Sequence, residues 1–314
     1  MKPILYLIIP SYNEETVLPE TAKRLLAKLH ALILTRYISE RSRILFCDDG
    51  SRDKTWEIIE DLHEKNREIL GLKLSRNRGH QHALLAGLLF AKGKCDVAIS
   101  LDADLQDDIA AIDKMLGKFR DGHDIVYGIR SSRETDSFFK RHFALLFYKL
   151  IRALGVDSVY NHADYRLTSR RVLENLADFR EVNLYLRGLF PLIGFKSTTV
   201  EYIRGKRFAG ESKYPFKKSL ALAIDGITSL SIKPLRLITF LGALIFAISV
   251  IFAIYLLVAK FLGVTNQGLT FIAISIWFIG GVQMLCLGIV GEYIGKIYFE
   301  TKSRPRFIIE KTLE

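Results

Sequence analysis

The sequence predicts an α/β domain with a mostly parallel sheet, followed by two helices that cross a membrane. Strand and helix patterns alternate through the first 130 residues, which is typical of such a sheet with helices on both faces. Segments 237–259 and 269–291 contain no charged residue, and each exceeds the roughly 20 residues that cross a bilayer core. Buried core helices are the alternative, but the length of both segments favours membrane spans.

The first apolar run, Ile4–Ile9, is soon broken by Pro10, so it indicates a strand and not a signal peptide. Four further strands are predicted at Ile44–Phe46, Leu70–Leu74, Asp96–Leu101 and Asp124–Gly128. Helices are predicted between them at Glu15–Leu34, Lys54–Asn66, His82–Lys92 and Ile109–Arg120. In open α/β sheets ligands bind beyond the carboxyl ends of the strands, so the residues that follow each strand are the candidate site.

Polar residues follow each of the first four strands, in segments 10–15, 48–55, 75–80 and 102–107. Singly, each segment reads as an ordinary loop, with Asn13 and Asp53 as helix N-caps. Four such segments at one edge of a sheet indicate a ligand. Asp102 and Asp104 form an Asp-x-Asp pair directly after an apolar strand, and carboxylates are ligands that hard divalent cations prefer.

Basic residues are concentrated in the second half of the domain. Arg130 and Arg133 precede a predicted helix, 136–155, that carries Lys140 and Arg141. A segment rich in Arg, Gly and Lys, 202–214, comes later. It is followed by an amphipathic pattern at 216–232, which predicts a helix lying in the membrane interface or packed on the domain.

The distribution of Lys and Arg predicts the orientation in the membrane. Basic residues precede the first span and follow the second, at positions 233, 236, 296, 302, 304, 306 and 311, whereas the connecting loop 260–268 carries one Lys. The positive-inside rule therefore places both termini and the α/β domain in the cytoplasm.

The net charge of +11 lies mainly near the membrane segments, which favours anionic lipid or a lipid phosphate over nucleic acid as the partner. The three cysteines form no paired motif, as expected in a reducing compartment. His80 and His82 could share one face of a strand, but no further metal ligand accompanies them.

Six blocks, in this order, resemble the inverting family-2 glycosyltransferases of GT-A fold, and within them the polyprenyl-phosphate glycosyltransferases related to dolichyl-phosphate mannose synthase. The blocks are IPSYNEE at 9–15, DDGSRDKT at 48–55, SRNRGHQHAL at 75–84, DADLQD at 102–107, RGKRFAGESKY at 204–214 and GEYIGKIYFETKSRP at 291–305. The resemblance covers nearly the whole chain. It implies a catalytic domain at 1–213, a juxtamembrane helix at 214–234, a membrane domain at 235–291 and a cytoplasmic tail at 292–314.

The resemblance also implies the roles of individual residues. Asp104 is expected to bind Mg²⁺ or Mn²⁺ directly, with Asp102 facing the ribose and the metal shell. The nucleotide of a UDP-sugar is expected to contact Pro10, Tyr12, Asn13, Glu14, Asp48, Asp49, Ser51, Asn77 and Asp102, with Asp49 accepting a hydrogen bond from uracil. Gln106 and Asp107 are expected to meet the sugar or the acceptor, and Arg207, Ser212 and Lys213 to form an acceptor or diphosphate loop. Arg78 stands where the family commonly has an aromatic residue.

The acceptor is expected to be a lipid phosphate held by Arg130, Arg133 and Arg141. The QxxRW motif of processive polysaccharide synthases is missing from the chain. A phosphomonoester is mostly a dianion at neutral pH, so it needs alignment more than a general base. If a base is used, Asp102 and Asp107 are the candidates.

These features predict a membrane-bound enzyme, open to homo-oligomer formation, that moves one hexose to undecaprenyl phosphate at the cytoplasmic face of the cell membrane. Glucose and N-acetylglucosamine are the nearest choices of sugar. The alternatives are another lipid acceptor such as diacylglycerol, or a non-catalytic nucleotide-binding membrane scaffold.

Overall fold

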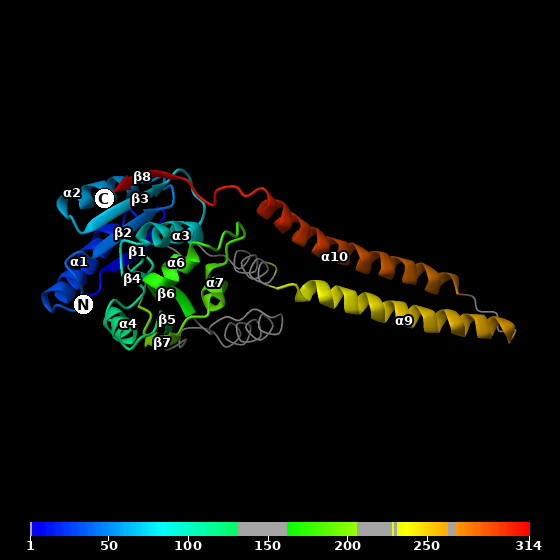
Figure 1. Ribbon diagram of the computed structural model, residues 1–314. Coiled ribbons are helices and arrows are strands. Elements are labelled where there is room, and N and C mark those ends of the chain that lie inside the picture. The colour runs from blue at the N-terminus through cyan, green and yellow to red at the C-terminus, as the bar shows by residue number, and fades with distance from the viewer. Residues whose placement is uncertain (1, 131–161, 206–227, 229–230, 263–267) are drawn as a thin grey trace.

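The computed structural model describes residues 2–130, 162–205, 228, 231–262 and 268–314. An eight-stranded sheet, in the order β7-β5-β6-β4-β1-β2-β3-β8, forms the centre of the domain (Figure 1). The strands are β1 (Leu5–Ser11), β2 (Arg43–Asp48), β3 (Ile69–Leu74), β4 (Val97–Ser100), β5 (Ile125–Arg130), β6 (His162–Ser169), β7 (Ser197–Tyr202) and β8 (Ile309–Leu313). Only β6 and β8 run antiparallel to their neighbours, so the prediction of a mostly parallel sheet is confirmed.

Helices cover both faces of the sheet, because its central strands are buried on both sides. On one face lie α1 (Leu18–Leu34), α2 (Thr55–Lys65) and α4 (Ala111–Arg120), and on the other lie α3 (His80–Ala91), α6 (Arg170–Leu176) and α7 (Leu186–Ile193). The stripe Leu18, Ala22, Leu25 and Leu29 of α1 recurs at helical spacing and is fully buried.

Helix α3 lies unusually close to the sheet. It is buried almost all round, since alanine, leucine and glycine fill most of it. A Cβ atom at Gly87 would stand 2.5 Å from the Sγ of Cys47 and 2.5 Å from the Cγ2 of Ile8. Only glycine therefore permits this approach, and the approach fixes the start of α3 at the edge where β1 and β2 end.

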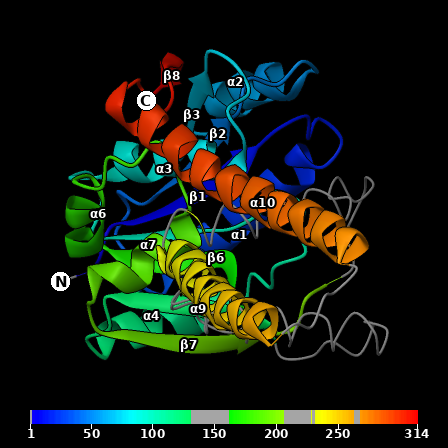
Figure 2. The same cartoon turned by 90° about the vertical axis from the view of Figure 1, so that its right-hand side faces the viewer.

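Two long helices, α9 (Lys233–Phe261) and α10 (Leu269–Thr301), leave the domain side by side (Figure 1). Both contain windows long and apolar enough to cross a membrane, Lys233–Phe252 and Phe278–Thr301, with none of either window buried. Figure 2 shows that both project from the same side of the domain. The predicted segments 237–259 and 269–291 lie within these two helices.

The end of the segment 292–314, expected as a tail, joins the sheet of the domain. Helix α10 continues to Thr301, and the chain then forms β8, which pairs antiparallel with β3. Strand β7 lies before the two long helices in the chain and β8 after them, and the two strands form opposite edges of the sheet. The α/β domain is thus completed by residues on both sides of the helical hairpin.

Two predicted elements lie outside the described residues. These are the helix at 136–155 and, apart from residues 228, 231 and 232, the amphipathic helix at 216–232.

Candidate active site

The loops that follow β1 and β2 are tied together by Asn13. Its amide N–H donates to the Oγ of Ser51 (3.0 Å), and its side-chain oxygen accepts from the amide of Arg52 (2.9 Å). Asn13 adopts a left-handed backbone (φ 52°), which asparagine tolerates better than most residues. Helix α1 begins only at Leu18, with no side-chain cap, so the interpretation of Asn13 as an N-cap is wrong.

Asp48 and Asp49 hold the adjoining turns. Asp48 accepts from the amide of Ser51 (3.2 and 3.3 Å), and Asp49 accepts from the amides of Arg78 (2.7 Å) and Gly79 (2.8 Å). Burial raises the pKa of both carboxyl groups, against the hydrogen bonds that lower it. The expected partners of a nucleoside therefore form one bonded rim at the carboxyl ends of β1, β2 and β3.

The other predicted nucleotide contacts lie at the same edge. Pro10 is next to last in β1, Tyr12 and Glu14 follow this strand, and Asn77 is exposed in the loop after β3.

The Asp-x-Asp pair lies on a tight turn after β4. Leu105 has a left-handed backbone (φ 57°), and Asp104 accepts from the amide of Gln106 (3.1 Å). Gln106 also accepts from the guanidinium of Arg204, and its carbonyl accepts from the amide of Gly205 (2.8 Å). The turn is therefore joined to the residues that follow β7.

Asp107 stabilises this turn through hydrogen bonds. Its carboxylate accepts from the hydroxyl of Tyr202 (2.7 Å) and from the amide of Asp102 (3.3 Å). Burial and, second, the charge of Asp102 raise the pKa of Asp107 to about 7, although Arg130 opposes the shift. Asp107, expected to meet the sugar or acceptor, is buried and holds the backbone of Asp102 in place.

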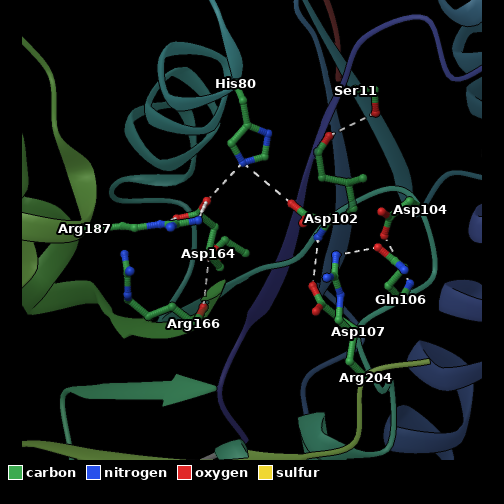
Figure 3. Close-up of polar contacts among 12 residues, drawn as sticks. Ser11, His80, Asp102, Asp104, Gln106, Asp107, Asp164, Arg166, Arg187 and Arg204 are labelled. Carbon is green, nitrogen blue, oxygen red and sulfur yellow. Dashed lines mark hydrogen bonds and ion pairs between the residues drawn. The ribbon is translucent and has the colours of Figure 1, made fainter. Parts of the chain in front are cut away.

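Three residues that sequence reasoning did not assign form a series of contacts that ends at Asp102 (Figure 3). The Nε2 of His80, in the first turn of α3, lies 3.6 Å from Asp102 and 3.5 Å from Asp164 of β6. The guanidinium of Arg187 in α7 donates one hydrogen bond to each carboxylate oxygen of Asp164, at 3.0 and 2.9 Å. Positive and negative groups therefore alternate from Arg187 through Asp164 and His80 to Asp102.

The charges in this cluster depend on one another. Burial would lower the pKa of His80, but its bond to Asp164 and the charge of Asp102 outweigh this and raise it to about 9. Burial would raise the pKa of Asp164, but Arg187 and His80 hold it well below its usual range. Burial, partly offset by His80, raises the pKa of Asp102. The two acidic neighbours thus favour the charged form of the imidazole.

Arg166 of β6 adds a buried guanidinium next to this cluster. The residue is 1% exposed, and its guanidinium nitrogens have no hydrogen-bond partner in the part of the chain that the structure describes. The guanidinium lies 3.9 Å from the ring centre of Phe190 and 5.2 Å from that of Tyr127. Burial lowers its pKa to about 10, so the group stays charged at neutral pH and is stabilised by the two rings.

One sequence signal could have located this part of the site. Residues 162–169 (HADYRLTS) alternate between polar and apolar side chains, which is typical of a strand. The pattern would have predicted β6 with Asp164 and Arg166 on one face. The prediction that His80 and His82 share a strand face is wrong, because both lie in the first turn of helix α3.

Arg130, expected to bind the lipid phosphate, is the last residue of β5 and lies beside Tyr202 and Asp107. Burial raises the pKa of both neighbours, and the positive charge of Arg130 opposes this rise. Arg133, Arg141, Arg207, Ser212 and Lys213 lie outside the described residues.

The donor set fits a cation that shares its ligands with a substrate. Among the described residues, no group of three or more His, Cys, Asp or Glu side chains could hold a metal ion. As a pair, Asp102 and Asp104 would leave most positions around such a cation open for substrate oxygens and water, as Mg²⁺ commonly requires.

Comparison with known proteins relates both parts of the chain to protein families. The family described as Glycosyl transferase family 2 matches residues 6–177, and the GtrB C-terminal hairpin matches residues 233–297. The uncharacterized glycosyltransferase YkoT of Bacillus subtilis is 50% identical over 309 residues, which cover 98% of this chain and 92% of that protein. The bactoprenol glucosyl transferase of Shigella phage SfII is 38% identical over 308 residues, 98% of this chain and 97% of that protein.

Among solved structures, mannosyl-3-phosphoglycerate synthase from Rubrobacter xylanophilus matches with a TM-score of 0.48 at 15% identity. The match covers 74% of each chain.

Proposed function

Because this chain belongs to glycosyl transferase family 2, we propose that it transfers one hexose, with inversion, from a UDP-sugar to undecaprenyl or another polyprenyl phosphate. UDP-glucose is the first choice of donor, since relatives that match 98% of this chain are named bactoprenol glucosyl transferases, and UDP-N-acetylglucosamine is the second. The observation that carries the proposal is that this family's domain and the matched apolar hairpin occur in one chain.

The bonded rim formed by Asn13, Asp48, Asp49 and Ser51 would hold the nucleoside of the donor. Asp104, with Asp102, would bind Mg²⁺ or Mn²⁺, which supplies positive charge to stabilise the departing diphosphate. Asp49 keeps acceptor capacity for uracil, because a carboxylate can accept more hydrogen bonds than the two it makes here.

The acceptor phosphate would enter from the membrane side and place one oxygen opposite the diphosphate at the anomeric carbon, which inverts the configuration. As a dianion it needs no base to remove a proton. Arg130, with Arg133 or Arg141, would neutralise and orient it, and Arg207, Ser212 and Lys213 would close on the diphosphate or acceptor.

The membrane arrangement supports a reaction at a bilayer surface. Both long helices leave one side of the domain, and basic residues flank their domain-proximal ends (Figures 1 and 2). We place the domain and both termini in the cytoplasm, where nucleotide sugars are made, and the hairpin in the cell membrane.

The test is to incubate the purified full-length chain with undecaprenyl phosphate, Mg²⁺ and each member of a panel of radiolabelled UDP-sugars. Extraction of the lipid should recover one hexose on a polyprenyl phosphate, with glucose giving the largest yield. A parallel reaction with diacylglycerol tests the second acceptor. UDP binding without any lipid product would support a non-catalytic scaffold and contradict the proposal.

A further inference from the structure

The block at 291–305 has no role in the chemistry proposed above, yet it extends the second membrane helix into the catalytic domain. Helix α10 has 33 residues and is therefore about 50 Å long, whereas a bilayer core is roughly 30 Å thick. Its last turns carry Glu292, Lys296 and Glu300, the first charged residues after the apolar segment. A rigid helix that is fixed in the membrane thus ends against the domain.

Glu300 makes this contact. Its carboxylate accepts from the amides of Val182 (2.9 and 3.0 Å) and Asn183 (2.9 Å) and from the side-chain amide of Asn183 (3.0 Å). Farther along the chain, the guanidinium of Arg306 donates to the carbonyl of Phe179 (2.7 Å). Segment 179–183 is therefore held at both ends by residues that follow the uncharged segment 269–291, through charge-assisted hydrogen bonds.

The same stretch of chain leads directly into the charge cluster of the active site. Leu186 donates its amide to the side chain of Gln81 (2.8 Å), which is next to His80 in α3. The following residue, Arg187, holds Asp164 with two hydrogen bonds, and Asp164 lies beside His80 (Figure 3). Only three residues separate Asn183, bound by Glu300, from Arg187.

We propose that Glu300 is a positioning residue for sugar transfer. By docking the end of α10 on Val182 and Asn183, it sets the start of α7 and so places Arg187 and Asp164 beside Asp102. The membrane helix then orients the catalytic groups in addition to retaining the enzyme at the bilayer. This inference rests on the proposed function, because the rate of sugar transfer is one of the two quantities that test it.

Loss of this dock should affect turnover more than donor binding. Removal of the carboxylate leaves the amides of Val182 and Asn183 without their acceptor, so the segment must shift to find water. A displacement of about 1 Å at reacting groups can lower a rate about a hundredfold. The rim that is proposed to hold the nucleoside is instead built by hydrogen bonds among the loops that follow β1, β2 and β3.

The experiment compares full-length Glu300→Ala and Glu300→Gln with wild type in detergent micelles. We expect kcat in Glu300→Ala to fall about tenfold or more, with the donor KM within about twofold and the melting temperature lowered by only a few degrees, so that the chain stays folded in the assay. Glu300→Gln keeps one acceptor oxygen and should recover part of kcat. The matched control is Glu174→Ala, which removes an exposed carboxylate from α6 and should match wild type.

A second comparison distinguishes positioning through Arg187 from general stabilisation. In an Arg187→Lys background, Glu300→Ala should lower kcat by less than about twofold more, because both changes act on the placement of Asp164. Independent effects that multiply, or wild-type kcat in Glu300→Ala, would overturn the proposal.

Hydrogen exchange provides a readout that needs no substrate. Amides in 182–187 should exchange faster in Glu300→Ala, and not in Glu174→Ala. If wild type forms no glycolipid, the proposed function fails. Unchanged exchange at 182–187 in Glu300→Ala would instead overturn the dock itself.

Discussion

The carboxylate of Asp104 illustrates how one residue combines structural and chemical tasks. It accepts the amide of Gln106, which shapes the turn, and it is proposed to supply a charged ligand to the divalent cation. Asparagine has the same shape and retains an acceptor oxygen, so it preserves the turn but removes the charge.

We therefore expect Asp104→Asn to lower transfer by at least a hundredfold while the chain stays folded. The proposed Mg²⁺ site would lose one of the two carboxylates, Asp102 and Asp104, that are expected to hold it. Transfer assays across a Mg²⁺ and Mn²⁺ series, with circular dichroism as the folding control, measure both effects. Full turnover by metal-stripped wild type in EDTA would contradict the metal role.

The geometry of Arg130 suggests a second residue-level test. Arg130 is the last residue of β5, and it lies next to Tyr202 and Asp107, close to the Asp-x-Asp turn. Arg130→Lys keeps the positive charge but loses the planar fork that binds phosphate through two hydrogen bonds.

We expect Arg130→Lys to lower kcat/KM for the lipid phosphate about tenfold to a hundredfold, the value of one charge-assisted hydrogen bond. UDP affinity, measured by calorimetry, should not change. Arg24→Lys, on the exposed part of α1, is the control. A merely membrane-attracting patch would tolerate Arg130→Lys as well as the control.

At the scale of residues, the sequence predicts side chains that directly follow a strand better than side chains that meet from distant parts of the chain. Asp102, Asp104 and Asp49 follow apolar strands directly, so the alternating pattern places them at the sheet edge. His80, Asp164 and Arg187 come from three different elements and meet only through packing of α3, β6 and α7. Nothing in the spacing of their sequence positions indicates that contact.

At the scale of elements, the close approach of α3 to the sheet can be tested at Gly87. An added methyl group would overlap Cys47 and Ile8, both fully buried. We expect Gly87→Ala to destabilise the domain by about 1–3 kcal/mol, as overpacking commonly does, and to lower the melting temperature by several degrees.

Gly117 of α4 offers a matched control for that substitution. A Cβ there would meet only the hydroxyl of Tyr37, at 3.8 Å, which is an ordinary contact. Gly117→Ala should leave stability equal or raise it by up to about 1 kcal/mol, because alanine favours a helix more than glycine. Equal thermal unfolding of the two variants would show that α3 does not require glycine.

Strand β8 shows which elements sequence patterns miss. Its residues, IEKTL, are mostly exposed, and its partner β3 lies more than 200 positions earlier in the chain. Ion pairs of Lys311 with Glu60 and of Lys94 with Glu314 fasten this edge. A pairing of this range depends on where the helical hairpin returns the chain, and no local signal reports that position.

At the scale of the whole molecule, the position of β8 determines which deletion can test the role of the membrane hairpin. A chain that ends after Ile232 would lose β8 and Glu300 together with the spans, so it cannot isolate the effect of membrane anchoring. The two ends to be joined lie near one another, because the hydroxyl of Tyr293 in α10 donates to the carbonyl of Ser231 (2.6 Å) and Ile308 follows Tyr293 by 15 residues. A flexible Gly/Ser linker of about 30–40 residues, joining Ile232 to Ile308, has a mean span of about 30–35 Å, which covers this separation and keeps β8 in place.

We expect this linker variant to fold and to bind UDP within about twofold of wild type, because the nucleoside rim lies on β1 and β2. Loss of Glu300 should lower its turnover on a short-chain, water-soluble polyprenyl phosphate. Turnover on long-chain acceptor in vesicles should fall by a further factor of about 100 or more, because anchoring raises the effective concentration of enzyme at the acceptor surface. The ratio of the two losses, measured at equal enzyme concentration, separates anchoring from positioning. Equal losses on the two acceptors would show that the hairpin serves only to dock α10 on the domain.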